Sequence, residues 1–343
     1  MNQKEKIVII VMVLIILISS TIGGILKINS DKQQENEQPN QIGQPKSFES
    51  INYGIKVQVN GKNMVFLVDG EKNETPIVIL PGLGVNAPAI THKPFAHALS
   101  DKFKVYSAEP FGYGISDQAD TERNIENIVS ELHTAVHELG LEKFYLIGHS
   151  AGGLYSLKYA NEYPEDLLGV IGIDNTPTPF EEAKIGKNET LALYKECNQK
   201  LKDGYWKNLD FEEWRNTNFE EFQLYVSPLD FTAEYSVEDM ENFQIIFGNN
   251  NCNDNIIDEI ELFSYNIDNS IGLKFPKDIP SIQFVSTANM GQSDNWKPAH
   301  DNLITNPKIQ EVVVIDGGHY MHLEQRDVIV EKINTWIEKI EMN

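Results

Sequence analysis

Residues 144–152 of the chain read Phe-Tyr-Leu-Ile-Gly-His-Ser-Ala-Gly, and they are the most informative part of the sequence for the fold. The apolar run Phe144–Ile147 predicts a buried strand, and Gly152–Asn161 predicts a helix that follows almost at once. Between them lies a G-x-S-x-G pattern centred on Ser150. Glycines two residues before and two residues after the serine avoid clashes across a sharp turn. The stretch therefore predicts a nucleophile elbow, which presents a serine hydroxyl for attack on a carbonyl carbon.

The same turn supplies a place for negative charge to develop. The backbone N–H of Ala151 and the N-terminus of the following helix both point toward an oxyanion at this position. A second donor is expected after the strand Ile77–Leu80, which runs into Pro81-Gly82-Leu83-Gly84. We therefore expect the N–H groups of Leu83 and Ala151 to form an oxyanion hole.

Strand and helix signals alternate on both sides of the elbow. Asn60-Gly61 lies between the first two strands and predicts a hairpin. The longest helix signal before the elbow covers Asn124–Leu139. The predicted strands, in chain order, are Ile55–Val59, Met64–Val68, Ile77–Leu80, Val105–Ala108, Phe144–Ile147, Val170–Ile173, Ile282–Ser286 and Val312–Ile315. Alternation of this kind is typical of an α/β protein with a mostly parallel sheet and helices on both faces.

A histidine follows the last predicted strand, in Gly317-Gly318-His319-Tyr320, and a helix is expected from Glu324 to about Ile340. A general base on the loop beyond the final strand can reach a serine at the centre of the sheet. His319 has that position, so we expect it to be the base. His322, three residues further on, is the alternative.

The order Ser150 … His319, together with the loop 111–116 after the fourth strand, resembles the α/β-hydrolase superfamily over about residues 51–343. The resemblance implies an eight-stranded, mostly parallel sheet with a variable cap inserted after the sixth strand. The strand–helix alternation stops in that place, and residues 175–280 are acidic and rich in aromatics. Aromatic spacings such as Phe211, Trp214, Phe219 and Phe222 favour helices. We therefore expect a helical cap over 175–280.

The acid partner of the histidine has two candidates. The resemblance places it in the loop after the seventh strand, where this chain has no carboxylate until Asp294. Some relatives carry it at the end of the sixth strand, where this chain has Asp174. That strand is the neighbour of the strand that carries Ser150, whereas Asp294 needs a long loop to fold back. Asp174 is the first candidate and Asp294 the alternative.

Composition excludes several functions. The 343 residues carry 28 Lys+Arg and 51 Asp+Glu, a net charge of 28 − 51 = −23, which opposes binding to nucleic acid. Two cysteines make neither a disulfide framework nor a Cys-based zinc site. Both Cys197 and Cys252 lie in the predicted cap, where one disulfide or two free thiols fit equally.

Two other features carry weaker signals. His133 and His137 are four residues apart on a predicted helix and could share a metal ion, but the Glu of an H-E-x-x-H motif is missing. We expect two ordinary histidines on a helix face and no metal site. Glu109, after the fourth strand, is expected to pack against the loop 111–116.

The N-terminal segment differs from the rest of the chain in its apolar composition. Residues 7–26 contain no charge and are mostly Ile, Val and Leu, and a helix of twenty residues spans roughly 30 Å of bilayer. A cleaved signal peptide has a shorter apolar core of about 7–15 residues. We expect a transmembrane anchor over 1–28, a flexible stalk over 29–50 and a hydrolase domain over 51–343. The short N-terminal flank favours a single-pass protein with its catalytic domain outside the cytoplasm.

Together these features predict a membrane-anchored serine hydrolase that needs no cofactor. Ser150, His319 and Asp174 would cleave a small-molecule ester or related acyl substrate through an acyl-enzyme. The membrane, reached through the N-terminal helix, is the other expected partner. A proline-type peptidase or amidase on the same fold, and a ligand-binding homologue without catalysis, are the alternatives.

Overall fold

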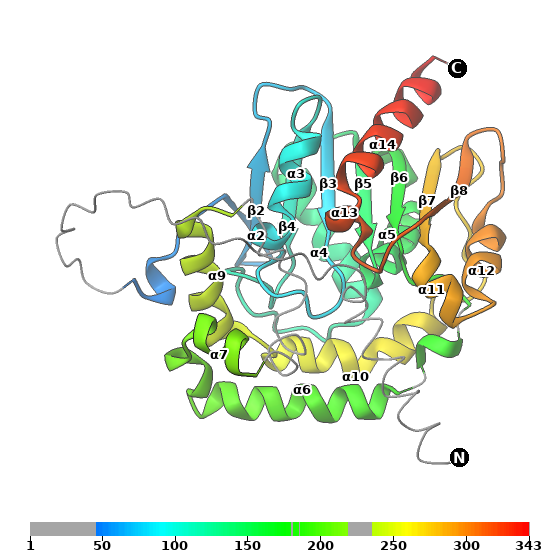
Figure 1. The fold of residues 1–343 in the computed structure, drawn as a ribbon. Helices are drawn as coiled ribbons and strands as arrows, with labels where there is room; N and C mark the ends of the chain where they lie inside the picture. Colours follow the sequence, from blue (N-terminus) through cyan, green and yellow to red (C-terminus); the bar gives the residue numbers. More distant parts are fainter. Residues whose placement is uncertain (1–45, 180, 185, 219–234, 343) are drawn as a thin grey trace, which may run out of the picture.

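The computed structural model describes residues 46–342 except 180, 185 and 219–234, and its centre is one sheet (Figure 1). Eight strands lie in the order β1-β2-β4-β3-β5-β6-β7-β8. Their bounds are β1 Ile55–Val59, β2 Lys62–Asp69, β3 Pro76–Leu80, β4 Lys104–Glu109, β5 Phe144–His149, β6 Leu167–Ile173, β7 Ser281–Ser286 and β8 Gln310–Ile315. Each contains or closely matches the strand predicted from sequence.

The pairing of the strands also agrees with prediction. β2 runs antiparallel to β1 and to β4, and the remaining neighbours are parallel. Asn60 and Gly61 close the first hairpin with φ angles of 53° and 83°, the left-handed conformation that a tight two-residue turn requires. The predicted hairpin and the mostly parallel sheet are confirmed.

Helices cover both faces of the sheet. Along β3, Val78 and Leu80 pack under α4 (Ile125–Glu138) and α5 (Ala151–Glu162). The alternate residues of the same strand, such as Ile79, pack under α3 (Lys93–Leu99) and α14 (Arg326–Glu341). Because β3 is buried on both faces, it reads as a continuous apolar run rather than an alternating one.

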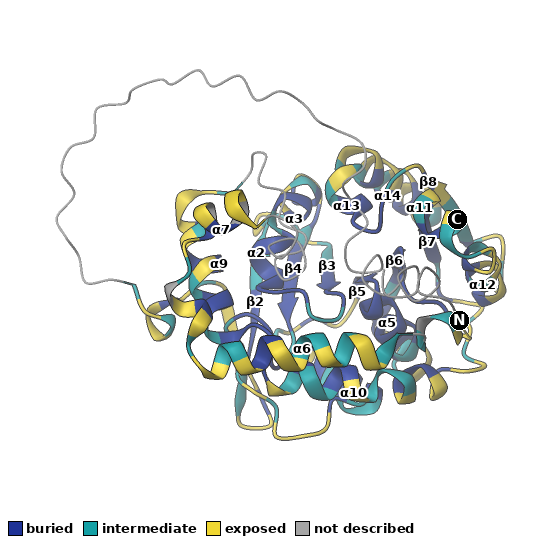
Figure 2. Ribbon diagram, turned by 60° about the horizontal axis from the view of Figure 1, so that its bottom comes forward, coloured by how far each residue is buried: buried dark blue, intermediate teal, exposed yellow. Residues whose placement is uncertain are grey.

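In the described residues between β6 and β7, where the insertion was expected, the regular elements are helices. They are η3 Glu181–Lys184, α6 Lys187–Lys202, η4 Tyr205–Asn208, α7 Phe211–Thr217, α9 Val237–Asn250 and α10 Asp254–Asp268. We call this set, without η3, the cap helices. In both views α6 and α10 lie side by side (Figures 1 and 2). The helical pattern predicted beyond Phe211 is confirmed as far as Thr217, and its continuation from residue 219 lies outside the described residues.

The cap helices have their own aromatic core. Its largest members are Trp206, Phe211, Trp214, Phe243 and Phe247. A disulfide between Cys197 on α6 and Cys252 between α9 and α10 adjoins this core, so the two cysteines are paired. These five aromatic side chains therefore pack against one another.

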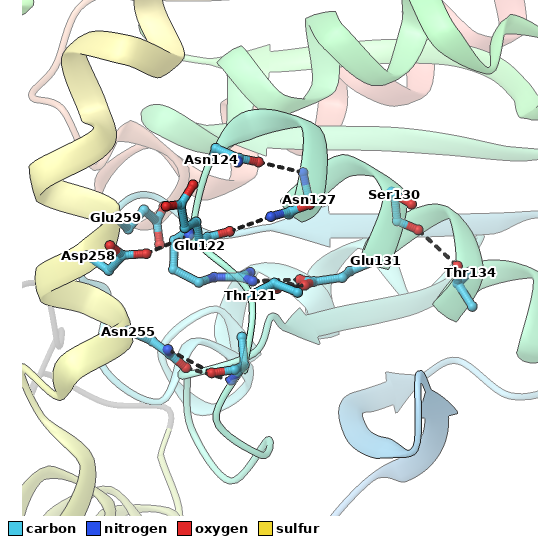
Figure 3. Close-up of polar contacts among 12 residues, drawn as sticks. Thr121, Glu122, Asn124, Asn127, Ser130, Glu131, Thr134, Asn255, Asp258 and Glu259 are labelled. Atoms are coloured by element: carbon cyan, nitrogen blue, oxygen red, sulfur yellow. Dashed lines mark hydrogen bonds and ion pairs between the residues drawn. The ribbon is translucent and has the colours of Figure 1, made fainter.

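Side chains of α10 accept hydrogen bonds from backbone N–H groups of the body. Asn255 and Asp258 face the segment before α4 (Figure 3). The Asn255 side chain accepts from the N–H of Ala119 at 2.7 Å, and the Asp258 carboxylate accepts from the N–H of Arg123 at 2.6 Å. The Arg123 guanidinium, buried below, pairs with Glu131 on α4 at 2.7 Å. The cap helices are thus attached at a defined position rather than resting on the body.

Several short helices were not predicted. They are α2 Pro88–Thr91, α3 Lys93–Leu99, α11 Thr287–Gln292, α12 Trp296–Leu303 and α13 Met321–Glu324. Each has eight residues or fewer, so it shows too few turns for a 3.6-residue period to be read. The predicted final helix is interrupted at Gln325, which separates α13 from α14.

The predicted membrane span, residues 7–26, and most of the predicted stalk lie outside the described residues. Over the ranges that the structure does describe, no helix has both the length and the apolar character needed to cross a membrane. The last residues of the predicted stalk belong to the folded part: Phe48–Ser50 form η1, and Phe48 packs against the aromatic core of the cap helices. The folded body therefore starts slightly before Ile51.

Candidate active site

Ser150 stands on a strained turn between β5 and α5. Its φ and ψ angles are 53° and −123°, a combination that side-chain-bearing residues rarely adopt. The turn brings backbone segments so close that a Cβ at Gly152 would lie 2.5 Å from the Pro81 carbonyl oxygen. A Cβ at Gly148 would lie 2.6 Å from the carbonyl oxygen of Gly152. Both glycines of the motif are therefore sterically required, as expected for a nucleophile elbow.

The elbow is tied to the end of the neighbouring strand. The N–H of Ser150 donates to the carbonyl of Ile173, the last residue of β6, at 3.2 Å. The N–H of Thr176 donates back to the carbonyl of Ser150 at 2.9 Å. Since His149 and Ile173 are partners in the parallel ladder, the next residues, Ser150 and Asp174, leave the sheet side by side.

The structure brings Asp174 and His319 into contact. His319 Nδ1 lies 2.8 Å from Asp174 Oδ2, and the two residues are 1% and 0% exposed. Asp174 also has a positive φ, 43°, and its N–H donates to the carbonyl of Phe284 on β7. An aspartate in this position can hold the imidazole with its proton on Nδ1, which leaves Nε2 free to accept a proton.

The Asp174 carboxylate accepts five hydrogen bonds. Oδ1 accepts from the Ser286 N–H at 2.9 Å and from Trp296 Nε1–H at 3.0 Å. Oδ2 accepts from Ser286 Oγ–H at 2.9 Å and from Asn289 Nδ2–H at 2.7 Å, besides His319. Such donors fix the position of a buried carboxylate.

Asp294, the alternative acid, is not part of this group. It lies exposed on the turn between α11 and α12. In the loop after β7 the place nearest His319 is taken by Asn289, whose Nδ2 is 3.4 Å from His319 Nδ1. Sequence reasoning missed Ser286, Asn289 and Trp296. The available signal was that the β7 loop carries polar neutral residues where a carboxylate was expected.

His149 links the histidine loop to the elbow. Its Nε2–H donates to the carbonyl of His319 at 3.1 Å, and the two rings lie 4.7 Å apart between centroids. No hydrogen bond joins Ser150 to His319 in the described part of the chain. In free enzymes such catalytic hydrogen bonds are often long and tighten only when substrate is bound.

The loop expected to provide the second oxyanion donor passes next to the nucleophile. A Cβ at Gly82 would lie 2.9 Å from the Ser150 Cβ, so the loop approaches the elbow closely. Ala151 begins α5, and Leu83 follows Gly82 directly. The structure therefore brings the segments of both predicted donors beside Ser150.

A buried polar chain connects this loop to α10. Tyr113 Oη accepts from the N–H of Gly84 at 3.1 Å and donates to Glu259 Oε2 at 2.8 Å. Tyr155 Oη on α5 donates to the other oxygen of Glu259. Burial raises the pKa of Glu259. A small cavity lined by Leu80, Pro81 and these side chains has room for about one water molecule, so it is not an acyl pocket.

Glu109 packs against the loop after β4, as predicted. Its Oε2 accepts from the N–H of Ile115 at 2.8 Å, and its Oε1 accepts from Tyr53 Oη–H at 2.7 Å. Burial raises the pKa of this carboxyl to about 7, although these hydrogen bonds oppose the rise. The residue supports the loop and does not contact His319.

His149 also belongs to a cluster of three buried histidines next to the site. His92, His149 and His322 are buried with their ring nitrogens within 4.8 Å of one another, and burial lowers the pKa of each, that of His92 to about 4. His322, the alternative base, makes no contact with Asp174. A second group that could hold an ion is His133, His137 and Asp166, on another part of the molecule.

Comparison with known proteins agrees with the fold. A sequence model of the alpha/beta hydrolase fold matches residues 75–236. The uncharacterized protein YbdG of Bacillus subtilis is 29% identical over 142 residues, which are 41% of this chain and 43% of that protein. A pimeloyl-[acyl-carrier protein] methyl ester esterase of Shewanella woodyi is 33% identical over 104 residues, 29% of this chain and 36% of the esterase. The chain thus spans less than half the length of these relatives.

A solved structure shows the same fold over most of the chain. A thermophilic esterase from Thermogutta terrifontis superposes with a TM-score of 0.58 over 83% of this chain and 98% of the esterase, at 18% identity. The eight-stranded sheet, the matched residues 75–236 and this superposition together show that the chain has the α/β-hydrolase fold.

Proposed function

We propose that this protein is a serine hydrolase that cleaves a carboxylic ester or a related acyl bond. Ser150 is the nucleophile, His319 the general base and Asp174 the residue that orients the base. The N–H groups of Leu83 and Ala151 stabilise the oxyanion. No cofactor takes part in this scheme.

The first half of the reaction forms an acyl-enzyme. Ser150 Oγ attacks the carbonyl carbon while its proton moves to His319 Nε2, and the carbonyl oxygen becomes the oxyanion held by Leu83 and Ala151. Collapse of this intermediate breaks the bond to the leaving alcohol, which takes the proton from His319. In the second half His319 Nε2 takes a proton from water, whose oxygen attacks the acyl carbon. The bond between this carbon and Ser150 Oγ then breaks, Oγ takes the proton back from His319, and the acid is released.

One observation carries the proposal: the 2.8 Å contact between His319 Nδ1 and Asp174 Oδ2 at the end of the strand next to the serine elbow. A buried carboxylate at this distance favours the tautomer with a free Nε2 and stabilises the charged imidazole that forms during catalysis. The five donors around the carboxylate fix its position.

Support for an ester substrate comes from the relatives. The Shewanella woodyi protein is a methyl ester esterase and the Thermogutta terrifontis protein is an esterase. We propose a small acyl ester for this chain. The aromatic core of the cap helices packs against itself, so the aromatic content of the cap alone does not define an apolar acyl pocket.

We also propose that residues 7–26 anchor the protein in a membrane, with the hydrolase domain on the outer side. The support is the length of the uncharged segment, twenty residues, and its Ile-, Val- and Leu-rich composition. The polar segment that follows would then act as the stalk.

The test combines labelling and turnover. The wild-type protein should react with a fluorophosphonate probe and hydrolyse p-nitrophenyl esters, with a chain-length series giving the acyl preference. Ser150→Ala should lose both signals. A Ser150→Ala protein that is labelled as strongly as wild type would overturn the assignment. Labelling without ester turnover, but with cleavage of proline-containing peptides or amides, would favour the peptidase or amidase alternative. Neither labelling nor turnover would favour the ligand-binding homologue.

A further inference from the structure

Two histidines on α4 and one aspartate before β6 converge on a single point. His133 and His137 lie one helical turn apart, and both direct Nε2 at the same atom, Asp166 Oδ2. The separations are 3.6 Å from His133 and 3.2 Å from His137. The sequence shows the histidine pair but not its third member, because Asp166 follows 29 residues after His137.

These separations match those between ligands of a tetrahedral metal ion. With metal–nitrogen and metal–oxygen bonds of roughly 2.0–2.1 Å, neighbouring ligand atoms lie about 3.3–3.4 Å apart. The three ligand atoms of this group all lie within 4.8 Å of one another. Only small movements of these three side chains would be needed for one ion to bond to all three ligand atoms.

We propose that His133, His137 and Asp166 form a binding site for a divalent transition-metal ion of the zinc type. Two imidazoles and one carboxylate are ligands that suit Zn²⁺ and its neighbours better than Mg²⁺ or Ca²⁺. The fourth position stays open to water or to a side chain of another molecule.

The ligands are held by their surroundings. Tyr159 Oη–H donates to Asp166 Oδ2 at 2.6 Å, which leaves a lone pair of that oxygen for an ion. The His133 ring stacks on Tyr163 with 3.8 Å between centroids and 17° between planes. Supporting contacts of this kind orient metal ligands and strengthen binding.

The group is also open to solvent on one side. The Asp166 side chain is 5% exposed, whereas those of His133 and His137 are 31% and 45% exposed. An ion can therefore reach the imidazoles from water and bond to a carboxylate that is already fixed. Glu165, next to Asp166, and the net charge of −23 add attraction for a cation.

The site is remote from the nucleophile. Asp166 directly precedes β6 and Asp174 directly follows it, and a strand of that length spans roughly 20 Å. The ion would thus link α4 to the start of β6 at the opposite edge of the sheet. Its role is to stabilise the body, not to take part in the reaction.

The experiment measures zinc binding and thermal stability. The full-length chain in mild detergent is stripped with a chelator and titrated with ZnSO₄ by calorimetry. We expect one Zn²⁺ per chain and a rise in melting temperature with zinc concentration. His133→Ala and His137→Ala should each weaken binding at least about tenfold, and Tyr159→Phe by about 10–100-fold. His97→Ala, an exposed histidine outside the group, is the matched control and should bind as wild type.

Two results would overturn the proposal. One is wild-type protein that takes up no zinc and shows no change in melting temperature. The other is undiminished zinc binding in the His133→Ala and His137→Ala variants, which would place the ion elsewhere, for example at His92, His149 and His322. Because both replaced histidines are partly exposed, the variants are expected to fold, and their melting temperatures without zinc verify it.

Discussion

Replacing Asp174 by Asn tests the proposed role of the acid with little change of shape. The substitution exchanges one carboxylate oxygen for an NH₂ group, which donates hydrogen bonds instead of accepting them. Because all five partners of the carboxylate are donors, the outcome depends on which oxygen position the NH₂ group takes.

The hydrogen-bond partners at the two oxygens determine which position the NH₂ group takes. At Oδ1 the NH₂ group would face the backbone N–H of Ser286 and Nε1–H of Trp296, and neither group can accept. At Oδ2 all partners can adapt. The Ser286 hydroxyl can rotate, the Asn289 amide can turn over, and His319 can move its proton from Nδ1 to Nε2. We therefore expect the NH₂ group at the Oδ2 position.

This placement predicts an inactive but folded protein. With Nδ1 accepting from the new amide, His319 carries its proton on Nε2 and cannot take one from Ser150. A wrong tautomer of this kind costs about 10⁴-fold in kcat, or about 5 kcal/mol of transition-state stabilisation. The two rigid donors, Ser286 N–H and Trp296 Nε1–H, keep their acceptor, so the melting temperature should fall by only a few degrees.

The assay compares kcat on a p-nitrophenyl ester, the rate of fluorophosphonate labelling and the melting temperature. Asp294→Asn is the matched control, since that residue is exposed and distant from His319, and it should behave as wild type. Asp174→Ala leaves both rigid donors without an acceptor and should be less stable than Asp174→Asn. Retention of kcat within tenfold in Asp174→Asn, or a large loss in Asp294→Asn, would refute the reasoning.

Three further predictions concern other parts of the molecule. Tyr113→Phe removes the acceptor of the Gly84 N–H and should lower kcat about tenfold by loosening the oxyanion loop. Tyr155→Phe removes a hydroxyl that donates to Glu259 and makes no bond to that loop, so it should leave kcat nearly unchanged; equal losses in steady-state assays would contradict this. Burial raises the pKa of Glu109 from 4.5 to about 7, so folding takes up a proton and stability falls as the pH rises from about 4.5 to about 7. Glu109→Gln should therefore remove on the order of 3 kcal/mol from the change in unfolding free energy over that window, and an unchanged dependence of stability on pH would count against the assignment. Deletion of residues 1–45 should move the protein from the membrane fraction to the soluble fraction with its esterase activity intact, and an inactive or insoluble product would show that this segment supports the fold.

The central part of the fold could be predicted because its signals are local. Apolar runs of four to six residues bounded by Gly, Pro or Asn identify strands, and the G-x-S-x-G pattern at Ser150 fixes a strand–helix turn. Asp174 could be named because it directly follows a strand, and His319 because it lies on the short loop after the last strand.

Features that depend on packing between distant segments could not be predicted. The Cα atoms of Cys197 and Cys252 lie 5.9 Å apart because α6 packs beside the turn between α9 and α10, and nothing local to either cysteine shows this. The donors Asn289 and Trp296 come from two short helices without readable periodicity. Asp166, the third member of the proposed metal group, is likewise distant in sequence from the histidines.

The position of the acid follows from the way the sheet holds the site. Ser150 and Asp174 leave the neighbouring strands β5 and β6 at the same level, and both have positive φ angles, 53° and 43°. Strained residues of this kind persist only where the surrounding structure determines them, and here hydrogen bonds from the Ser150 and Asp174 N–H groups to the adjacent strands do so. The nucleophile and the acid are thus fixed by one pair of strands. Only His319 lies on a loop, and it is held through its ring by Asp174 and through its carbonyl by His149. With the carboxylate supplied by β6, the loop after β7 needs only a neutral donor, and Asn289 provides it.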